Sequence, residues 1–147
     1  MFLISHRGNV DQKIPALENT PDYIDRALSI GYDVELDVWF ESGRWYLGHD
    51  MPVTEVTVDY LTNDKFWCHA KNLEALQEML AHGSIRCFWH QEDDVTLTSD
   101  RYVWTYPGKK LVKNSICVMP ERYNLKKNDW RFKVCAGICS DVISQFK

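Results

Sequence analysis

The run Asp33-Val34-Glu35-Leu36-Asp37-Val38 alternates acidic and aliphatic residues along the chain. Because successive side chains of a β-strand point to opposite faces, this run predicts a strand with its carboxylates on one face and its aliphatic residues on the other. Two adjacent anions in a buried sheet repel each other unless a cation or a basic side chain lies between them. Hard divalent cations such as Mg²⁺ and Ca²⁺ prefer such oxygen ligands. Taken alone the Glu35-x-Asp37 pair is a weak signal, because solvated strand faces also carry such pairs.

This strand is expected to continue into a hairpin. The chain runs to Phe40, turns around Gly43 and returns through residues 45–48, and glycine suits such a turn. Other short apolar, β-branched or aromatic runs predict six further strands, at residues 2–5, 66–70, 85–89, 102–106, 116–119 and 134–139.

Two helices are predicted between these strands. The first covers residues 21–30, with Thr20 as its cap and Gly31 at its end, and its apolar stripe is Tyr23, Ile24, Ala27 and Leu28. The second follows Asn72, stops at Gly83, and carries Leu73, Leu76, Met79 and Leu80 on one face. Shorter helical turns are expected at residues 58–61 and near Asp141.

The order of strands and helices is that of βαβ units, which favours a parallel sheet covered by helices. A full eight-unit barrel takes at least about 200 residues, whereas this chain has 147. We therefore expect an α/β fold: a compact, helix-poor TIM-type (β/α) barrel of mainly parallel strands, with a β-hairpin extension after the second strand. The chain must therefore lack several outer helices of a full barrel, and we expect them to be absent from residues 89–138.

Composition narrows the class of protein. With 147 residues and 45% hydrophobic content, residues 1–147 are expected to form a single domain. A net charge of −4 provides no basic field for a nucleic acid. No run approaches the roughly 18 apolar residues of a membrane span, and no signal peptide precedes the strand at Phe2. The five cysteines are an odd number within apolar runs, which predicts reduced core thiols and a cytoplasmic location.

Two further motifs place histidines at predicted strand ends. His6-Arg7-Gly8 ends the first strand, and Gly48-His49-Asp50 ends the hairpin. Histidine exchanges protons near neutral pH, and arginine binds two phosphate oxygens through its planar fork. Two histidines at one site allow one imidazole to act as base and the other as acid.

The order of these motifs resembles the amino-terminal signature of the glycerophosphodiester phosphodiesterase family. The matching runs cover the first third of the chain, and residues 136–141 are similar to the family's last barrel strand, whereas the middle is much less similar. The matching runs are Ile4-Ser5-His6-Arg7-Gly8, Glu18-Asn19-Thr20-Pro21, Gly31-Tyr32-Asp33-Val34-Glu35-Leu36-Asp37-Val38 and Leu47-Gly48-His49-Asp50.

The resemblance implies a role for each matching residue. His6 and His49 would be the catalytic acid and base, and Glu35 and Asp37 would bind a divalent metal ion. Arg7 would hold the phosphate, and Lys71 would contact the phosphate or another part of the substrate. Glu18 would either orient His6 or Arg7, or hold the residues around the metal ion in place, and the sequence does not decide between these roles.

The chain departs from the family at His69-Ala70-Lys71, where the family usually has Glu-x-Lys. If His69 is the third metal ligand, the site loses a negative charge and binds Mg²⁺ or Ca²⁺ more weakly, or prefers Mn²⁺ or Zn²⁺. Alternatively, an acidic residue of the run Glu92-Asp93-Asp94 supplies the charge.

The expected function is metal-dependent hydrolysis of a small phosphodiester of the glycerophosphodiester type, releasing an alcohol. Two alternatives stay open: a phospholipase D-like lyase that forms a cyclic phosphate, and a catalytically degenerate barrel that binds a phosphorylated ligand. The sequence leaves the oligomeric state unknown. The polar or aromatic runs at residues 90–94 and 104–108 also follow predicted strands, which places them at the rim of such a barrel.

Overall fold

The computed structural model describes residues 1–147 and contains ten strands, three α-helices and three 3₁₀ turns. The strands are β1 (Phe2–His6), β2 (Asp33–Glu41), β3 (Arg44–Leu47), β4 (Thr54–Val56), β5 (Phe66–Ala70), β6 (Cys87–Trp89), β7 (Val95–Leu97), β8 (Val103–Thr105), β9 (Ser115–Val118) and β10 (Gly137–Ser140). The helices are α1 (Pro21–Ser29), α2 (Val58–Leu61) and α3 (Leu73–His82), and the 3₁₀ turns are η1 (Pro120–Tyr123), η2 (Trp130–Lys133) and η3 (Ile143–Phe146).

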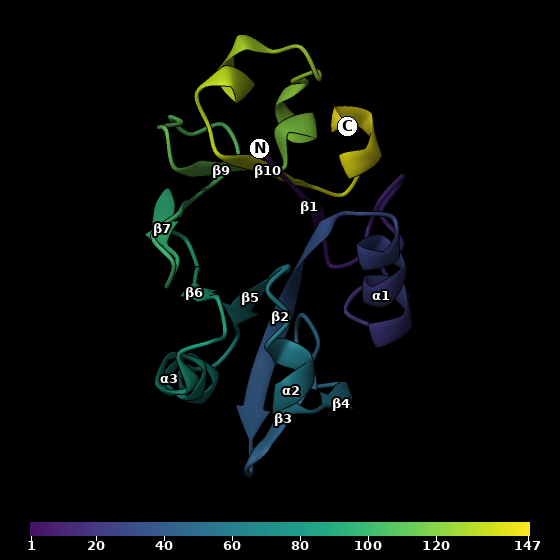
Figure 1. The fold of residues 1–147 in the computed structure, drawn as a ribbon, viewed down its shortest axis with the longest axis vertical. Helices are drawn as coiled ribbons and strands as arrows, with labels where there is room; N and C mark the ends of the chain where they lie inside the picture. Colours follow the sequence, from purple (N-terminus) through teal and green to yellow (C-terminus); the bar gives the residue numbers. More distant parts are fainter.

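All ten strands belong to one mixed sheet, whose main path is β4-β3-β2-β1-β10-β9-β8-β7. The long strand β2 is the branch point. Its first half pairs with β1 and its second half with β3, while β5 pairs along its other edge and leads to β6. Figure 1 shows the sheet curling, with the helices on its outside.

The predicted TIM-type (β/α) barrel of mainly parallel strands is wrong. The sheet is partly antiparallel: six strand pairings are parallel, and the pairings β2–β3, β3–β4 and β7–β8 are antiparallel. From β6 onward, loops and 3₁₀ turns connect the strands, so the sheet lacks the covering helices of a (β/α) barrel. The connections between β6 and β9, residues 90–94, 98–102 and 106–114, are too short for crossover helices, and the longer connection from β9 to β10 forms the 3₁₀ turns η1 and η2 instead of an α-helix.

The curled sheet is not closed by strand pairing, since β6 pairs only with β5. Side chains and loop backbone join its two ends instead. The Thr96 hydroxyl donates to the Trp89 carbonyl at 2.7 Å, and the Ser99 amide donates to the Cys87 carbonyl at 2.8 Å. The chain that follows β6 therefore provides hydrogen-bond donors for the backbone carbonyls of Cys87 and Trp89 along its free edge.

Two apolar cores lie on the two faces of the sheet. The larger has 21 buried residues and holds Val34, Leu36 and Val38 of β2 together with the helices. The smaller lies inside the curl and consists of Ile4, Trp67, Phe88, Trp104, Ile116 and Cys139. The alternation predicted for β2 is confirmed, because Glu35 and Asp37 project from the face opposite to its aliphatic residues.

The inner core has a polar layer above it. Because strand residues i and i+2 share a face, Ile4 is followed by His6, Trp67 by His69, Phe88 by His90, and Cys139 by Asp141. Strand register places two of these polar residues next to the carboxylates of β2: His6 pairs with Glu35, and His69 pairs with Asp37. A site is thus assembled at the carboxyl ends of the parallel strands.

The two predicted helices are confirmed, with some differences at their surfaces. Asn72 caps α3 by accepting from the Ala75 amide, whereas the Thr20 hydroxyl donates to the Leu17 carbonyl and does not cap α1. The apolar stripe predicted for α3 is partly wrong: Leu73 and Leu80 are exposed, and the buried residues are Ala75 and Met79. Even α3, with ten residues, falls short of the length of a membrane-spanning helix, and neither of the other two helices reaches it.

Candidate active site

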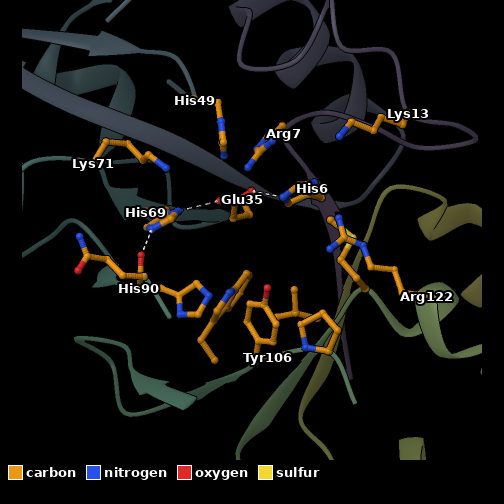
Figure 2. A pocket seen from close by; sticks show the side chains of 15 residues that line it. His6, Arg7, Lys13, Glu35, His49, His69, Lys71, His90, Tyr106 and Arg122 are labelled. Carbon is orange, nitrogen blue, oxygen red and sulfur yellow. Dashed lines mark hydrogen bonds and ion pairs between the residues drawn. The ribbon is translucent and has the colours of Figure 1, made fainter. Parts of the chain in front are cut away.

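A cavity of about 480 Å³ opens at the carboxyl ends of the strands, above the inner core. Its lining is strongly cationic, with Glu35 as its only carboxylate. Figure 2 shows His6, Arg7, His49 and His69 around Glu35, with Lys13 and Arg122 farther out. The basic lining residues are Arg7, Lys13, Lys71 and Arg122, and the imidazoles are His6, His49, His69 and His90. Such a lining suits an anionic ligand.

Glu35 lies at the floor of this cavity and lacks hydrogen bonds. Its side chain is 3% exposed, and Oε2 is buried without a partner. The nearest groups are the rings on either side: His6 Nε2 is 3.6 Å from Oε2, and His69 Nδ1 is 3.8 Å from Oε1. Burial and the charge of Asp37 raise the pKa of Glu35. An ionised carboxylate buried without partners is costly, and a bound cation would offset that cost.

Asp37, in contrast, is surrounded by donors. Its Oδ2 accepts from Asn19 Nδ2 at 2.9 Å and lies 2.8 Å from Arg7 Nε, and its backbone amide donates to Asn19 Oδ1 at 2.9 Å. Its Oδ1 faces His69 Nδ1 at 3.0 Å and Lys71 Nζ at 3.5 Å. Burial would raise the pKa of Asp37, but His69, Arg7 and Lys71 outweigh burial and lower it.

The orientation of His69 is fixed from behind. Its Nε2 lies 3.0 Å from the His90 carbonyl, which can only accept, so Nε2 carries a hydrogen. The ring also stacks on Phe88 at a centroid distance of 5.1 Å. With a hydrogen on Nδ1 as well, the ring donates to Asp37 Oδ1; without that hydrogen, Nδ1 presents its lone pair to Glu35 and Asp37, as a metal ligand would. A ligand histidine whose other nitrogen donates to a carbonyl is the usual arrangement at metal sites.

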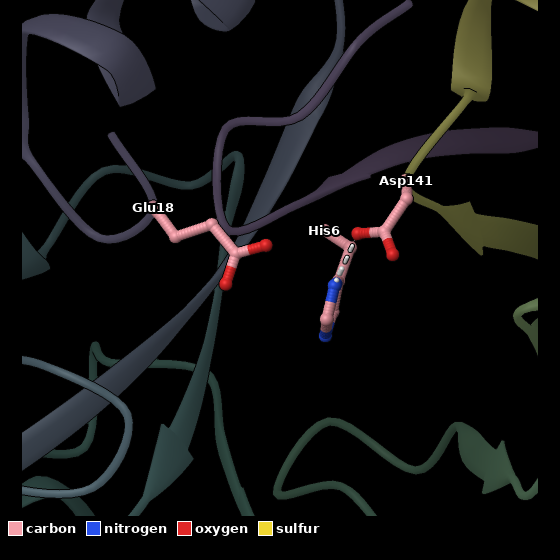
Figure 3. A group of neighbouring side chains, drawn as sticks. All are labelled: His6, Glu18 and Asp141. Carbon is pink, nitrogen blue, oxygen red and sulfur yellow. Dashed lines mark hydrogen bonds and ion pairs between the residues drawn. The ribbon is translucent and has the colours of Figure 1, made fainter. Parts of the chain in front are cut away.

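His6 is held by Asp141, which directly follows β10 (Figure 3). Its Nδ1 lies 2.7 Å from Asp141 Oδ1, and both side chains are mostly buried. Because an ionised carboxylate only accepts, Nδ1 carries the hydrogen and Nε2 is free to take a proton. Burial would raise the pKa of Asp141, but the hydrogen bonds from His6 and Asn9 lower it.

His49 reaches the same cavity from the loop after β3. Its Nδ1 is 2.6 Å from Asp50 Oδ1, and its side chain is 45% exposed. A second cavity, of about 510 Å³, shares Arg7, Lys13 and His49 with the first. His49 therefore lies where the two cavities meet, and it exchanges protons with solvent more easily than His6 does.

Glu18 lies behind the cavity wall and contacts Arg7 rather than His6. Its Oε2 accepts from Arg7 Nη1 at 3.2 Å, and its Oε1 accepts from Asn9 Nδ2 at 2.8 Å. The same Asn9 amide donates to Asp141 Oδ1 at 2.8 Å, so Asn9 connects the supports of Arg7 and His6. Burial would lower the pKa of Arg7, but the charges of Asp37, Glu35 and Glu18 raise it.

Two groups of side chains bring potential ligand atoms within 4.8 Å of one another: Glu35, Asp37 and His69, and separately His6, Glu18 and Asp141. Asn9 already joins the carboxylates of the second group through its amide. Only the first group has a buried carboxylate oxygen with no donor within 3.5 Å, Glu35 Oε2, whereas Asp37 Oδ1 has His69 Nδ1 at 3.0 Å. The first group is therefore the one whose chemistry fits a divalent cation.

The acidic run offered as an alternative source of charge is engaged elsewhere. Asp93 lies 2.9 Å from His90 Nδ1, Asp94 pairs with Lys109 at 2.6 Å, and Glu92 is exposed. Six of the eight site residues predicted from the sequence line the cavity: His6, Arg7, Glu35, His49, His69 and Lys71. The other two, Asp37 and Glu18, form ion pairs with Arg7 in the lining.

Sequence reasoning did not assign roles to Asp141, Asn9, His90 and Arg122. A signal existed for two of them, since Asp141 and His90 each follow an apolar strand residue by two positions. Asn9 and Arg122 follow strands in segments without a helical or strand period, so no periodicity indicates where their side chains point.

Comparison with known proteins identified no relative. No family model matches the chain, and neither a curated protein nor a solved structure matches it.

Proposed function

We propose that this protein is a metal-dependent phosphodiesterase that hydrolyses a small phosphodiester of the glycerophosphodiester type. The observation that carries the proposal is Glu35, a buried carboxylate without hydrogen bonds, flanked by two imidazoles at the floor of a cationic cavity. Five free thiols favour a cytoplasmic setting for it.

Glu35, Asp37 and His69 would hold the divalent cation, Mg²⁺ or Ca²⁺, with Mn²⁺ or Zn²⁺ favoured by the imidazole ligand. When bound there, the ion would withdraw charge from a phosphoryl oxygen. Arg7 and Lys71 line the same cavity and would neutralise the remaining oxygens. Glu18 and Asp37 keep the Arg7 guanidinium in place from behind.

His6 and His49 would perform the proton transfers. Each ring has its Nδ1 next to a carboxylate, Asp141 for His6 and Asp50 for His49, which leaves both Nε2 atoms available. One histidine would take a proton from the attacking hydroxyl, and the other would give a proton to the departing alcohol oxygen. The more buried His6 and the exposed His49 differ in solvent access, which suits them to opposite roles.

A second candidate is binding of a phosphorylated ligand without turnover. The observation that favours it is that Arg7 and Lys71 already lie near Asp37, at 2.8 and 3.5 Å, so basic side chains offset part of the acidic charge without a metal. Such a protein would bind phosphodiesters in the presence of chelator and release no alcohol.

The test is hydrolysis of glycerophosphodiesters by purified protein with Mg²⁺, Ca²⁺, Mn²⁺ or Zn²⁺ and with chelator. We expect metal-dependent release of alcohol, and a loss on the order of 10² to 10⁴ in rate for His6→Ala. His82→Ala, at the exposed end of α3, is the matched control. Activity that survives both His6→Ala and Glu35→Ala would overturn the proposal. Phosphorus NMR of the product would reveal a cyclic phosphate if the reaction is that of a lyase.

A further inference from the structure

Two cations at the rim of the cavity take no part in the proposed chemistry. Arg122 lies in η1 and makes no ion pair, and Lys13 has only Glu18 within reach, at 3.9 Å. Figure 2 shows both on the side of His6 away from His69 and Lys71. They are therefore separate from the groups around Glu35 and available to a ligand.

The backbone that carries Arg122 is fixed next to His6. The neighbouring Glu121 accepts from the Ser140 hydroxyl at 2.8 Å and from the Asp141 amide at 3.0 Å, which ties η1 to the residue that orients His6. On its other side the Tyr123 ring packs on Gly108, where an added Cβ would lie 2.4 Å from the ring. Because Glu121 is satisfied in this way, Arg122 has no acidic partner from its own segment.

The charges of the rim argue against a cationic alcohol. The only carboxylate that lines the cavity is Glu35, and it is buried beneath the imidazoles. An aromatic cage for an ammonium group is also missing, because Trp104 is only 4% exposed and Tyr106 is the one exposed aromatic ring of the lining. An anion beside Arg122 and Lys13 would gain charge-assisted hydrogen bonds.

We propose that Arg122 and Lys13 form a subsite for a second anionic group, a phosphomonoester or carboxylate carried by the alcohol part of the phosphodiester. The proposal rests on the function proposed above and specifies its substrate class. The diester phosphorus would lie at Glu35, Arg7 and Lys71, and the second anion beyond His6.

The test compares three glycerophosphodiesters that differ in the charge of their alcohol: cationic glycerophosphocholine, neutral glycerophosphoglycerol, and glycerophosphoglycerol carrying a terminal phosphate. We expect the highest kcat/KM for the anionic substrate. Arg122→Gln and Lys13→Gln should each lower the ratio of anionic to neutral kcat/KM by about tenfold. Lys127→Gln, an exposed lysine of the following loop, should leave this ratio unchanged.

Calorimetric binding of glycerol 3-phosphate and of glycerol 1,3-bisphosphate separates the two proposals. If the bisphosphate binds more tightly than glycerol 3-phosphate, and Arg122→Gln removes this difference, the subsite is supported. If the same protein hydrolyses none of the three substrates, the proposed hydrolysis is refuted. Turnover with equal kcat/KM for the three substrates, or with a preference for the choline ester, would refute the subsite and leave the hydrolysis standing. Equal binding of the two phosphates would likewise overturn the subsite.

Discussion

Glu35 and Asp37 occupy one face of one strand, yet their surroundings act on them in opposite directions. Burial and the charge of Asp37 raise the pKa of Glu35, whereas His69, Arg7 and Lys71 overcome burial and lower that of Asp37. The difference arises because Asp37 has direct donors and Glu35 has none. Of the two carboxylates, Glu35 is therefore the one whose ionisation a bound cation would favour more.

Replacing His69 tests the metal preference. His69→Glu adds a third carboxylate beside Glu35 and Asp37, so we expect the affinity for Mg²⁺ to rise relative to that for Mn²⁺ by about tenfold. Calorimetric titration of both metals measures this ratio, with His82→Glu as the control. An unchanged ratio in His69→Glu would show that residue 69 does not coordinate the metal.

Replacing Asp141 tests the support of His6. At pH 7 we expect Asp141→Asn to be less stable than wild type by about 1 to 3 kcal/mol, because a buried charge-assisted hydrogen bond is lost. The pKa of Asp141 is lowered in the folded state, so its stabilisation is present above the ordinary aspartate pKa and is lost as the pH falls through the lowered one.

Urea unfolding of both proteins between pH 7 and pH 3 measures this effect, and the stability difference should narrow at the acidic end. A difference that stays constant over this range would mean that Asp141 does not act through its charge.

Among the elements, the loop after β3 shows how backbone geometry positions a side chain. Gly48 has φ +154°, and a Cβ there would lie 2.1 Å from the Met51 carbonyl oxygen, a backbone atom that cannot move freely. Gly43 in the hairpin turn has φ +77° and nothing within 4 Å of its Cβ position. The conformation of residue 48 therefore fixes where His49 enters the cavity.

We expect Gly48→Ala to be destabilised by about 1 to 3 kcal/mol more than Gly43→Ala, because only the former adds a steric clash to the strained φ. Thermal unfolding measures the difference in stability. The Gly48 variant should also lose more of the proposed phosphodiesterase activity than the Gly43 variant, through displacement of His49. Equal effects of the two substitutions would contradict this account of the loop.

The elements that local patterns predicted are those with strong periodicity or clear boundaries. Strand β2 has alternating residues, and Asn72 and Gly83 bound α3. The three-residue strands β4 and β7 were missed because Thr54–Val56 and Val95–Leu97 are too short to show a period. Leu73 and Leu80 were placed in the core by spacing alone, but no neighbouring element covers them.

For the whole molecule, strand order depends on long-range pairing that no local pattern contains. The sequence indicated one β-hairpin after the second strand, but not that β4 extends it or that β7 turns back antiparallel on β8. The site was more predictable than the architecture, because Glu35, Asp37, His6 and His69 lie on strands whose parallel register brings them together. Arg122 and Asn9 depended on loops whose paths only the structure gives.

The cysteines provide a test of the whole fold. All five are free, and four are buried while Cys135 is partly exposed. Burial raises the pKa of the Cys117 thiol to about 12 and also raises those of the other four. Because the thiolate is the reactive form, we expect a thiol reagent at pH 8 to modify Cys135 first, and all five only in denaturant. Fast modification of Cys68, in the larger core, or of Cys139, in the inner core, would contradict the burial of these cores.

The most direct test of the proposed metal-dependent site is anomalous diffraction from crystals soaked in Mn²⁺. The account predicts one strong peak in contact with carboxylate oxygens of Glu35 and Asp37 and with Nδ1 of His69, while His69 Nε2 keeps its hydrogen bond to the His90 carbonyl. A peak between His6, Glu18 and Asp141, or no peak within the cavity at all, would contradict it.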